Sequence, residues 1–251
     1  MKLERYYSEI YKRYGNVTRA RGCFLYTQKN VRLTDLNQEG GRAILGWDSS
    51  ARTVFKDVMS KSLLGSFKSA HFGRLQKAVS ELLKSERKIF LFSGKKDAMK
   101  AALLLDAESS SAYKPFNGVD YSAVQNVVAA PPLPWTNNFF VLASSDLDAE
   151  IPQENFPPAL LAAAARSIYD LIAALKERQE KDFFIYDKVL TKFFERKACW
   201  LRPKIPEEKY DDFVLACLDA GVAVNPEYNM DSIVPYGADK GVLKKMGEIN
   251  V

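Results

Sequence analysis

Hydrophobic positions along the chain recur with helical and strand-like spacing, and this pattern predicts a mixed fold. Residues 2–14 carry apolar and aromatic side chains at helical spacing, with charges between them. The apolar runs 22–27 and 31–36 flank a short polar turn, which predicts a β-hairpin. The segments 49–64 and 71–85 are again helical in their spacing. The first third of the chain therefore combines helices with short strands.

A short apolar strand at 88–92 leads through a Ser-Gly turn into another predicted helix. Such a turn directs unpaired backbone N–H groups and the positive end of a helix dipole at one place, which favours an anion. The candidate phosphate or anion-binding residues are Ser93, Gly94, Lys95 and Lys96. The alternative is an ordinary strand-to-helix turn with a capping serine and two solvated lysines.

The second half of the chain begins with a change of composition. Residues 106–138 are rich in Pro, Asn and Ser, which predicts loops with one strand. The elements predicted after them are a strand at 139–143, a long helix at 159–177, a helical segment at 185–194, a strand at 198–201, a helix at 206–221 and a strand at 222–226.

Composition narrows the possible functions. The 36 basic and 31 acidic residues are mixed along the chain, and there is no basic block typical of nucleic-acid binding. Cys23, Cys199 and Cys217 lie far apart, without the spacing of a zinc site or a disulfide framework. No apolar run approaches a membrane span. We therefore expect a cytoplasmic protein that has no metal site and binds neither nucleic acid nor a membrane.

Three further places could carry chemistry, and each has a simpler structural interpretation. Gly40-Gly41-Arg42 is typical of a tight turn with a surface arginine, although it could be a ligand loop. His71 is the sole histidine, so it cannot form a histidine-based metal pair by itself. Asp146 and Asp148 could bind a cation or act in a cofactor-free enzyme, but capping or solvation is the more ordinary role.

Three of these segments resemble parts of the fold-type-I pyridoxal-phosphate (PLP) aminotransferases. Residues 22–36 are similar to the N-terminal hairpin of that family, in which a Gly-x-x-Leu-Tyr-Asp run precedes a glycine-containing loop. Residues 90–103 are similar to its strand, Ser-Gly-Thr-Glu-Ala turn and helix, whose turn amides hold the cofactor phosphate. Lys95 and Lys96 stand where Thr and Glu are usual, so the backbone contacts of the family are possible here but the hydroxyl contact is not. Residues 198–235, a predicted strand, helix and strand, resemble the small C-terminal domain of these enzymes.

The residues that would perform the family's chemistry are missing from the matching positions. An active member needs a Schiff-base lysine, an acid beside the pyridine nitrogen and usually an arginine for the substrate carboxylate. Between Leu105 and Pro157 there is no Asp-Glu-x-x-Gly strand and no Ser-x-x-Lys motif, and the only lysine is Lys114. The C-terminal strand 231–235 contains no arginine. The resemblance therefore lacks its catalytic middle.

The resemblance implies an α/β fold with a shortened aminotransferase-like large domain and a C-terminal α+β small domain, divided as 1–156 and 157–251. We expect a degenerate, non-transaminating pseudoenzyme with no cofactor, which binds a small anionic ligand or a protein partner and forms a homodimer. The alternative is an active PLP-dependent aminotransferase whose Schiff-base lysine has no assigned position. Catalytic residues are unassigned in both cases.

Overall fold

The computed structural model describes residues 1–63, 65 and 69–250 and has an α/β fold. The chain forms two compact units, one made of Met1–Asp48 with Arg178–Val251 and the other of Ser49–Glu177. This division differs from the expected boundary between residues 156 and 157, because the N-terminal hairpin groups with the C-terminal segment. The helix expected over 49–64 is observed as α2 (Ala51–Met59), and position 64 lies outside the described residues.

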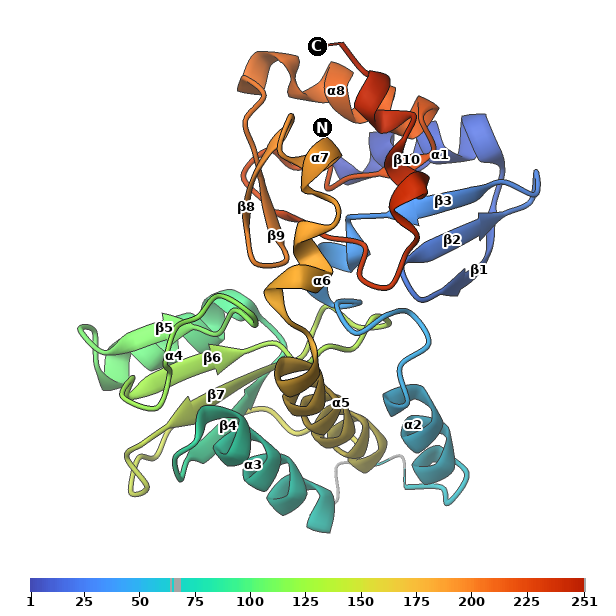
Figure 1. The fold of residues 1–251 in the computed structure, drawn as a ribbon. Helices are drawn as coiled ribbons and strands as arrows, with labels where there is room; N and C mark the ends of the chain where they lie inside the picture. Colours follow the sequence, from blue (N-terminus) through green and yellow to red (C-terminus); the bar gives the residue numbers. More distant parts are fainter. Residues whose placement is uncertain (64, 66–68, 251) are drawn as a thin grey trace. The chain divides into compact units, whose positions relative to one another are not determined.

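The unit formed by Ser49–Glu177 is built on a four-stranded sheet in the order β4-β7-β6-β5 (Figure 1). Its strands are β4 (Lys88–Phe92), β5 (Ser110–Ala112), β6 (Asn126–Ala129) and β7 (Phe140–Ser144). β7 is antiparallel to both neighbours and β5 is parallel to β6, so β4, β5 and β6 share one direction. The expected loop region 106–138 therefore contains two strands, because β5 is too short to show a hydrophobic period.

Successive side chains of β4 point to opposite faces of the sheet, and each face packs against different helices. Ile89 and Leu91 pack with α3 (Ala70–Leu83) and α5 (Pro158–Glu177) in one hydrophobic cluster. Phe90 and Phe92 pack with Ala98 and Ala102 of α4 (Lys95–Leu105) in another. The sheet is thus covered on both faces, as the strand period of two requires.

The long helix α5 confirms the prediction for 159–177 and lies in the core. By length and composition it could cross a membrane, but 67% of its most apolar window is buried within the protein. Its alanines at 163 and 164 are fully buried beside α3 and the sheet. This burial is typical of a core helix in a soluble protein.

The unit formed by Met1–Asp48 and Arg178–Val251 contains a second four-stranded sheet, in the order β1-β2-β3-β10. The strands are β1 (Val17–Arg21), β2 (Phe24–Thr27), β3 (Arg32–Asp35) and β10 (Val222–Ala223). The β2–β3 hairpin confirms the prediction, whereas β1 was not anticipated because its side chains are mostly exposed and polar. β10 joins β3 in parallel, which ties the two ends of the chain into one sheet.

A smaller sheet in the same unit changes the prediction for residues 185–201. Two short helices, α6 (Glu180–Phe184) and α7 (Asp187–Leu190), precede the hairpin of β8 (Phe194–Lys197) and β9 (Trp200–Pro203). The strand expected at 198–201 is wrong at its start, since Ala198 has φ 51° in the hairpin turn. β11 (Ser232–Ile233) pairs with β9 and completes the sheet.

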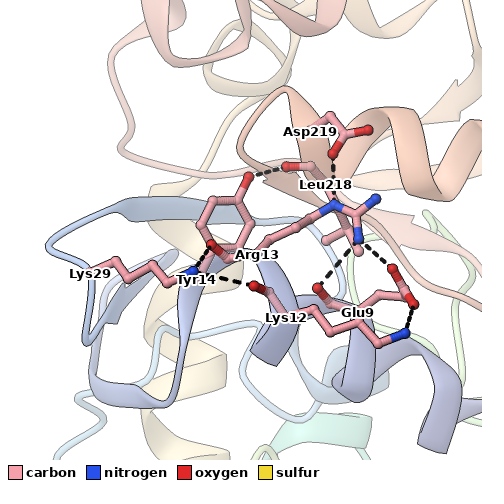
Figure 2. Close-up of polar contacts among 7 residues, drawn as sticks. All are labelled: Glu9, Lys12, Arg13, Tyr14, Lys29, Leu218 and Asp219. Atoms are coloured by element: carbon pink, nitrogen blue, oxygen red, sulfur yellow. Dashed lines mark hydrogen bonds and ion pairs between the residues drawn. The ribbon is translucent and has the colours of Figure 1, made fainter.

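Helices α1 (Leu3–Tyr14) and α8 (Glu207–Asp219) confirm the two amphipathic patterns at the chain ends. Figure 2 shows how polar contacts join them. Arg13 bonds to Glu9 and Asp219, and the Tyr14 hydroxyl donates to the carbonyl of Leu218. These contacts fix the C-terminal end of α1 beside the C-terminal end of α8.

The predicted turn of the hairpin also provides a hydrogen-bond donor to the C-terminal end of α1. Lys29 donates from Nζ to the carbonyl oxygens of Lys12 at 3.2 Å and Arg13 at 2.9 Å (Figure 2). A helix leaves its last carbonyls without intrahelical partners, and a cation there also complements the helix dipole. The turn between β2 and β3 therefore caps α1.

Candidate functional site

The strand, turn and helix around Ser93 form as the sequence predicts. β4 ends at Phe92, and α4 begins at Lys95 with Gly94 in an extended N-cap conformation. The first helical bond runs from the N–H of Ala98 to the carbonyl of Gly94, at 3.1 Å. Gly94 has no side chain to cap the helix, so the first-turn N–H groups need other acceptors.

A carboxylate of the chain itself lies at this turn. The backbone N–H of Ser93 donates to Oε1 of Glu154 at 2.8 Å, and the Ser93 hydroxyl donates to the same oxygen at 2.9 Å. Both donors that Ser93 could offer to an external anion are therefore directed at Glu154.

A second carboxylate stands beside Gly94. A Cβ atom added to Gly94 would lie only 2.8 Å from Oδ2 of Asp97, so the glycine allows this carboxylate to approach the backbone closely. Asp97 lies in the first turn of α4, where the helix dipole favours negative charge. Lys95 and Lys96 are both exposed. The four candidate residues thus form one turn, in which the Ser93 N–H is bonded to Glu154 and the Asp97 carboxylate lies close to Gly94.

The phosphate of PLP does not fit this arrangement. A phosphate held by the Ser93 amide would have to replace Glu154, and it would then meet the carboxylate of Asp97 at the same turn. Two negative groups close together repel each other, which disfavours phosphate binding at this turn. The Ser93 hydroxyl, a further donor at this turn, is also bonded to Glu154. The backbone of the turn therefore has the shape of a phosphate-binding turn, but the carboxylates of Glu154 and Asp97 already supply negative charge there.

Lys114, the only lysine between Leu105 and Pro157, follows the carboxyl end of a strand, as the Ser93 turn does. β4, β5 and β6 run in one direction, so their carboxyl ends lie at the same end of the sheet, where ligands of open α/β sheets commonly bind. Lys114 follows β5, and its backbone N–H donates to the Tyr121 hydroxyl at 3.0 Å. Three strand spacings separate β4 from β5, which is about 14 Å. Ser93 and Lys114 therefore do not form one compact site by direct contact.

Asp146 and Asp148 lie at the opposite end of this sheet, where β4 begins. They follow β7, whose last residue Ser144 pairs with Lys88 at the start of β4. Both acids are exposed, and the N–H of Asp148 donates to Oδ1 of Asp146 at 3.0 Å. Their geometry is that of a polar turn, so the two carboxylates are not brought to the Ser93 turn.

The glycines at 40 and 41 belong to a tight turn organised by a buried acid. Asp35 is 2% exposed and accepts bonds from the N–H groups of Asn37 and Gln38 and, at 2.8 Å, from Nε1 of Trp47. Burial raises the pKa of Asp35 to about 6, although these bonds act in the opposite direction. Gly40 and Gly41 both have positive φ, at 61° and 98°. No local hydrophobic pattern indicated that Asp35 would be buried.

Arg87 is a second residue whose role the sequence did not indicate. It is fully buried, and its guanidinium donates to Ser85 Oγ and to four backbone carbonyls. These carbonyls belong to Tyr121, Ser122, Val124 and Gln125, at 2.6–3.1 Å. A planar guanidinium with five donors can satisfy all of them, so Arg87 fixes the loop before β6.

The histidine and cysteines form no combined site. Desolvation and the neighbouring charges of Arg74 and Lys61 lower the pKa of His71. Cys23, Cys199 and Cys217 are buried thiols, and burial raises the pKa of Cys217 well above its usual range. Among the described residues, no group of three or more His, Cys, Asp or Glu side chains is placed to hold a metal ion.

Comparison with known sequences identifies two bacterial relatives. Models of known protein families give no match. An uncharacterized protein of Treponema pallidum is 26% identical over 93% of this chain and 93% of its own length. An uncharacterized protein of Borreliella burgdorferi is 24% identical over 90% of this chain and 87% of its own.

Comparison with solved structures gives a consistent fold. An ornithine aminotransferase from Plasmodium yoelii has a TM-score of 0.69 at 12% identity, covering 98% of this chain and 97% of its own. An omega-transaminase from Sphaerobacter thermophilus has a TM-score of 0.69 at 10% identity, covering 96% of each chain. A serine palmitoyltransferase variant from S. paucimobilis, solved with a bound PLP–myriocin aldimine, has a TM-score of 0.66 at 11% identity, covering 98% of this chain and 95% of its own. The chain has the fold of the fold-type-I PLP-dependent aminotransferases.

Proposed function

We propose that this protein is a non-transaminating pseudoenzyme with an aminotransferase-like fold, and that it acts as a binding or interaction protein without PLP. The observation that carries the proposal is the pair of hydrogen bonds from Ser93 to Glu154. In the resembled enzymes the corresponding turn holds the cofactor phosphate. Here an internal carboxylate takes that place.

The sequence supports the same proposal independently. Lys114 is the only lysine between Leu105 and Pro157, and no acid-containing strand motif of the family occurs there. Residues 231–235 provide no arginine for a substrate carboxylate. A protein that has lost the phosphate site, the lysine and the arginine together has no remaining arrangement for transamination.

Absorbance and borohydride reduction test this proposal directly. The purified protein is scanned for a cofactor chromophore before and after PLP is added, treated with borohydride, and digested for mass spectrometry. We expect no stoichiometric chromophore and no saturable, lysine-linked adduct. A reducible adduct at one lysine with full occupancy contradicts the proposal and favours the active aminotransferase.

Lys114 is where that alternative would be tested first. It follows the carboxyl end of β5, at the same end of the sheet as Ser93, which is where a Schiff-base lysine would be needed. Lys114→Met is compared with Lys100→Met, which changes an exposed lysine of α4. Adduct formation that is lost only in Lys114→Met identifies the lysine. Equal, weak labelling of both variants is expected if PLP reacts only with surface amines.

We also propose a homodimer in the cytoplasm. The resembled enzymes build their sites across a dimer interface, and α1 carries Leu3, Tyr7 and Tyr11 four residues apart, with exposures of 44%, 47% and 60%. A second copy would cover this stripe. Light scattering coupled to size-exclusion chromatography is expected to give twice the monomer mass, and Tyr11→Lys is expected to weaken the association. A monomeric wild-type protein contradicts the proposal.

A further inference from the structure

The segment from Ile151 to Phe156, here called the β4 strap, lies along the outer edge of the sheet. β4 is the edge strand, with β7 on its inner side. On the outer side, the N–H of Glu154 donates to the carbonyl of Leu91 at 2.9 Å, and the N–H of Leu91 donates to Oε1 of Gln153 at 3.3 Å. The strap therefore satisfies backbone groups that an edge strand would otherwise expose.

Apolar side chains hold the two ends of the strap on opposite faces of the sheet. Ile151 packs with the cluster of Phe90 and Phe92 on the α4 face. Phe156 packs with the cluster on the α3 and α5 face, where its ring meets Phe139 edge-on at 4.9 Å between centroids. Because the strap crosses the edge of β4 between these anchors, the backbone position of Glu154 is fixed from both sides.

This position brings the Glu154 carboxylate to the start of α4. Its Oε1 accepts from both the amide and the hydroxyl of Ser93, at 2.8 and 2.9 Å. A carboxylate at a helix N-terminus is favoured by the dipole, and bonds from N–H groups to a charged oxygen are stronger than neutral ones. The strap thus supplies the anion that the turn geometry favours.

We propose that the β4 strap is a built-in seal, in which Glu154 permanently occupies the phosphate turn and excludes external anions. The inference rests on the same interpretation of the turn as the proposed function, but it concerns anion binding rather than catalysis. An external phosphate must compete with a carboxylate that is tethered beside the turn, whose effective concentration is in about the millimolar range or above. Asp97 adds a second negative charge close to Gly94.

Titration with inorganic phosphate tests the seal. The backbone amide signals of Ser93 and Gly94 are followed by NMR in the wild type, Glu154→Ala and Glu154→Gln. The matched control is Glu150→Gln, which removes one negative charge from an exposed position four residues earlier. We expect no saturable shift in the wild type or in Glu150→Gln. Removal of the carboxylate in Glu154→Ala is expected to give a saturable shift, with a phosphate Kd roughly tenfold or more below the limit set by the wild-type titration.

Glu154→Gln separates charge from shape, because its amide oxygen still accepts from Ser93 while the negative charge is lost. We expect an intermediate gain in phosphate affinity, and this variant also serves if Glu154→Ala is poorly folded. Saturable phosphate shifts at Ser93 and Gly94 in the wild type overturn the seal. Unchanged phosphate affinity in both Glu154 variants overturns it as well. Neither result depends on a lysine-linked chromophore, so failure of the seal is distinguishable from failure of the proposed function.

Discussion

The guanidinium of Arg13 lies 2.6 Å from the carboxylate of Asp219, although the two residues are 206 positions apart in the sequence (Figure 2). The contact joins the last turn of α1 to the last residue of α8. Because the Asp219 side chain is 65% exposed, we expect Asp219→Asn to cost at most about 1 kcal/mol of unfolding free energy. Urea unfolding at low and high salt measures the cost, which should shrink as salt screens the pair.

Arg13→Met is expected to destabilise more than Asp219→Asn. It also removes the bonds from Arg13 to the Glu9 side chain and carbonyl, as well as the packing of the arginine stem. Equal costs for the two variants would contradict the view that Arg13 connects α1 internally as well as to α8.

Replacement of Arg87 by methionine is expected to be far more damaging than a surface change. The variant removes the guanidinium donor from four backbone carbonyls of residues 121–125, of which those of Tyr121 and Gln125 keep a second donor in the N–H groups of Val124 and Ser145. We expect a loss of at least about 3 kcal/mol, measured by urea unfolding. The control Arg74→Met changes an exposed arginine of α3 and is expected to stay within about 0.5 kcal/mol of the wild type. A small effect of Arg87→Met would mean that the loop before β6 is held by other contacts.

The pH dependence of stability should report Asp35. Its pKa is raised to about 6 in the folded protein, above the value of 3.8 for an unperturbed aspartate. The folded state therefore binds more protons between these values, so this group lowers the unfolding free energy as pH rises through the window. The shift corresponds to about 3 kcal/mol between the two ends of the window.

Asp35→Asn isolates this contribution, because asparagine does not titrate. The difference in unfolding free energy between wild type and variant is measured from pH 4 to pH 7. We expect the wild type to lose stability relative to the variant as pH rises. Asparagine also cannot accept from Trp47 through its NH₂ group, so a constant cost is expected at every pH. A difference that does not change with pH contradicts the raised pKa.

Gly41 and Gly73 should respond to alanine in opposite directions. Gly41 has φ 98°, and an added Cβ would lie 3.2 Å from Cη2 of Trp200. We expect Gly41→Ala to destabilise by roughly 1–3 kcal/mol. Gly73 is helical in α3 with open space around its Cβ position, so Gly73→Ala should stabilise by about 0.5–1 kcal/mol. Thermal unfolding of both variants checks the signs, and a stabilising Gly41→Ala would contradict the backbone assignment.

The sequence by itself determined the elements whose burial follows a regular period. Helices α1, α5 and α8, the β2–β3 hairpin and the β4–turn–α4 segment follow the local pattern closely, since a helix or strand with one buried face repeats every 3.6 or 2 residues. These segments also carried the family resemblance, so the fold class could be inferred from them. Strands β1 and β5 were missed because exposed or very short strands leave no such period.

Only the tertiary structure decided what surrounds the candidate turn. Glu154 lies 61 positions from Ser93, and no local pattern links an exposed glutamate to a distant amide. The same holds for Arg87 and Asp35, whose partners are backbone groups and a tryptophan brought close by the fold. Hydrogen bonding between distant segments depends on chain topology, which hydrophobic periodicity does not encode. The sequence determined that a phosphate-type turn exists, and the tertiary structure placed the chain's own carboxylate in it.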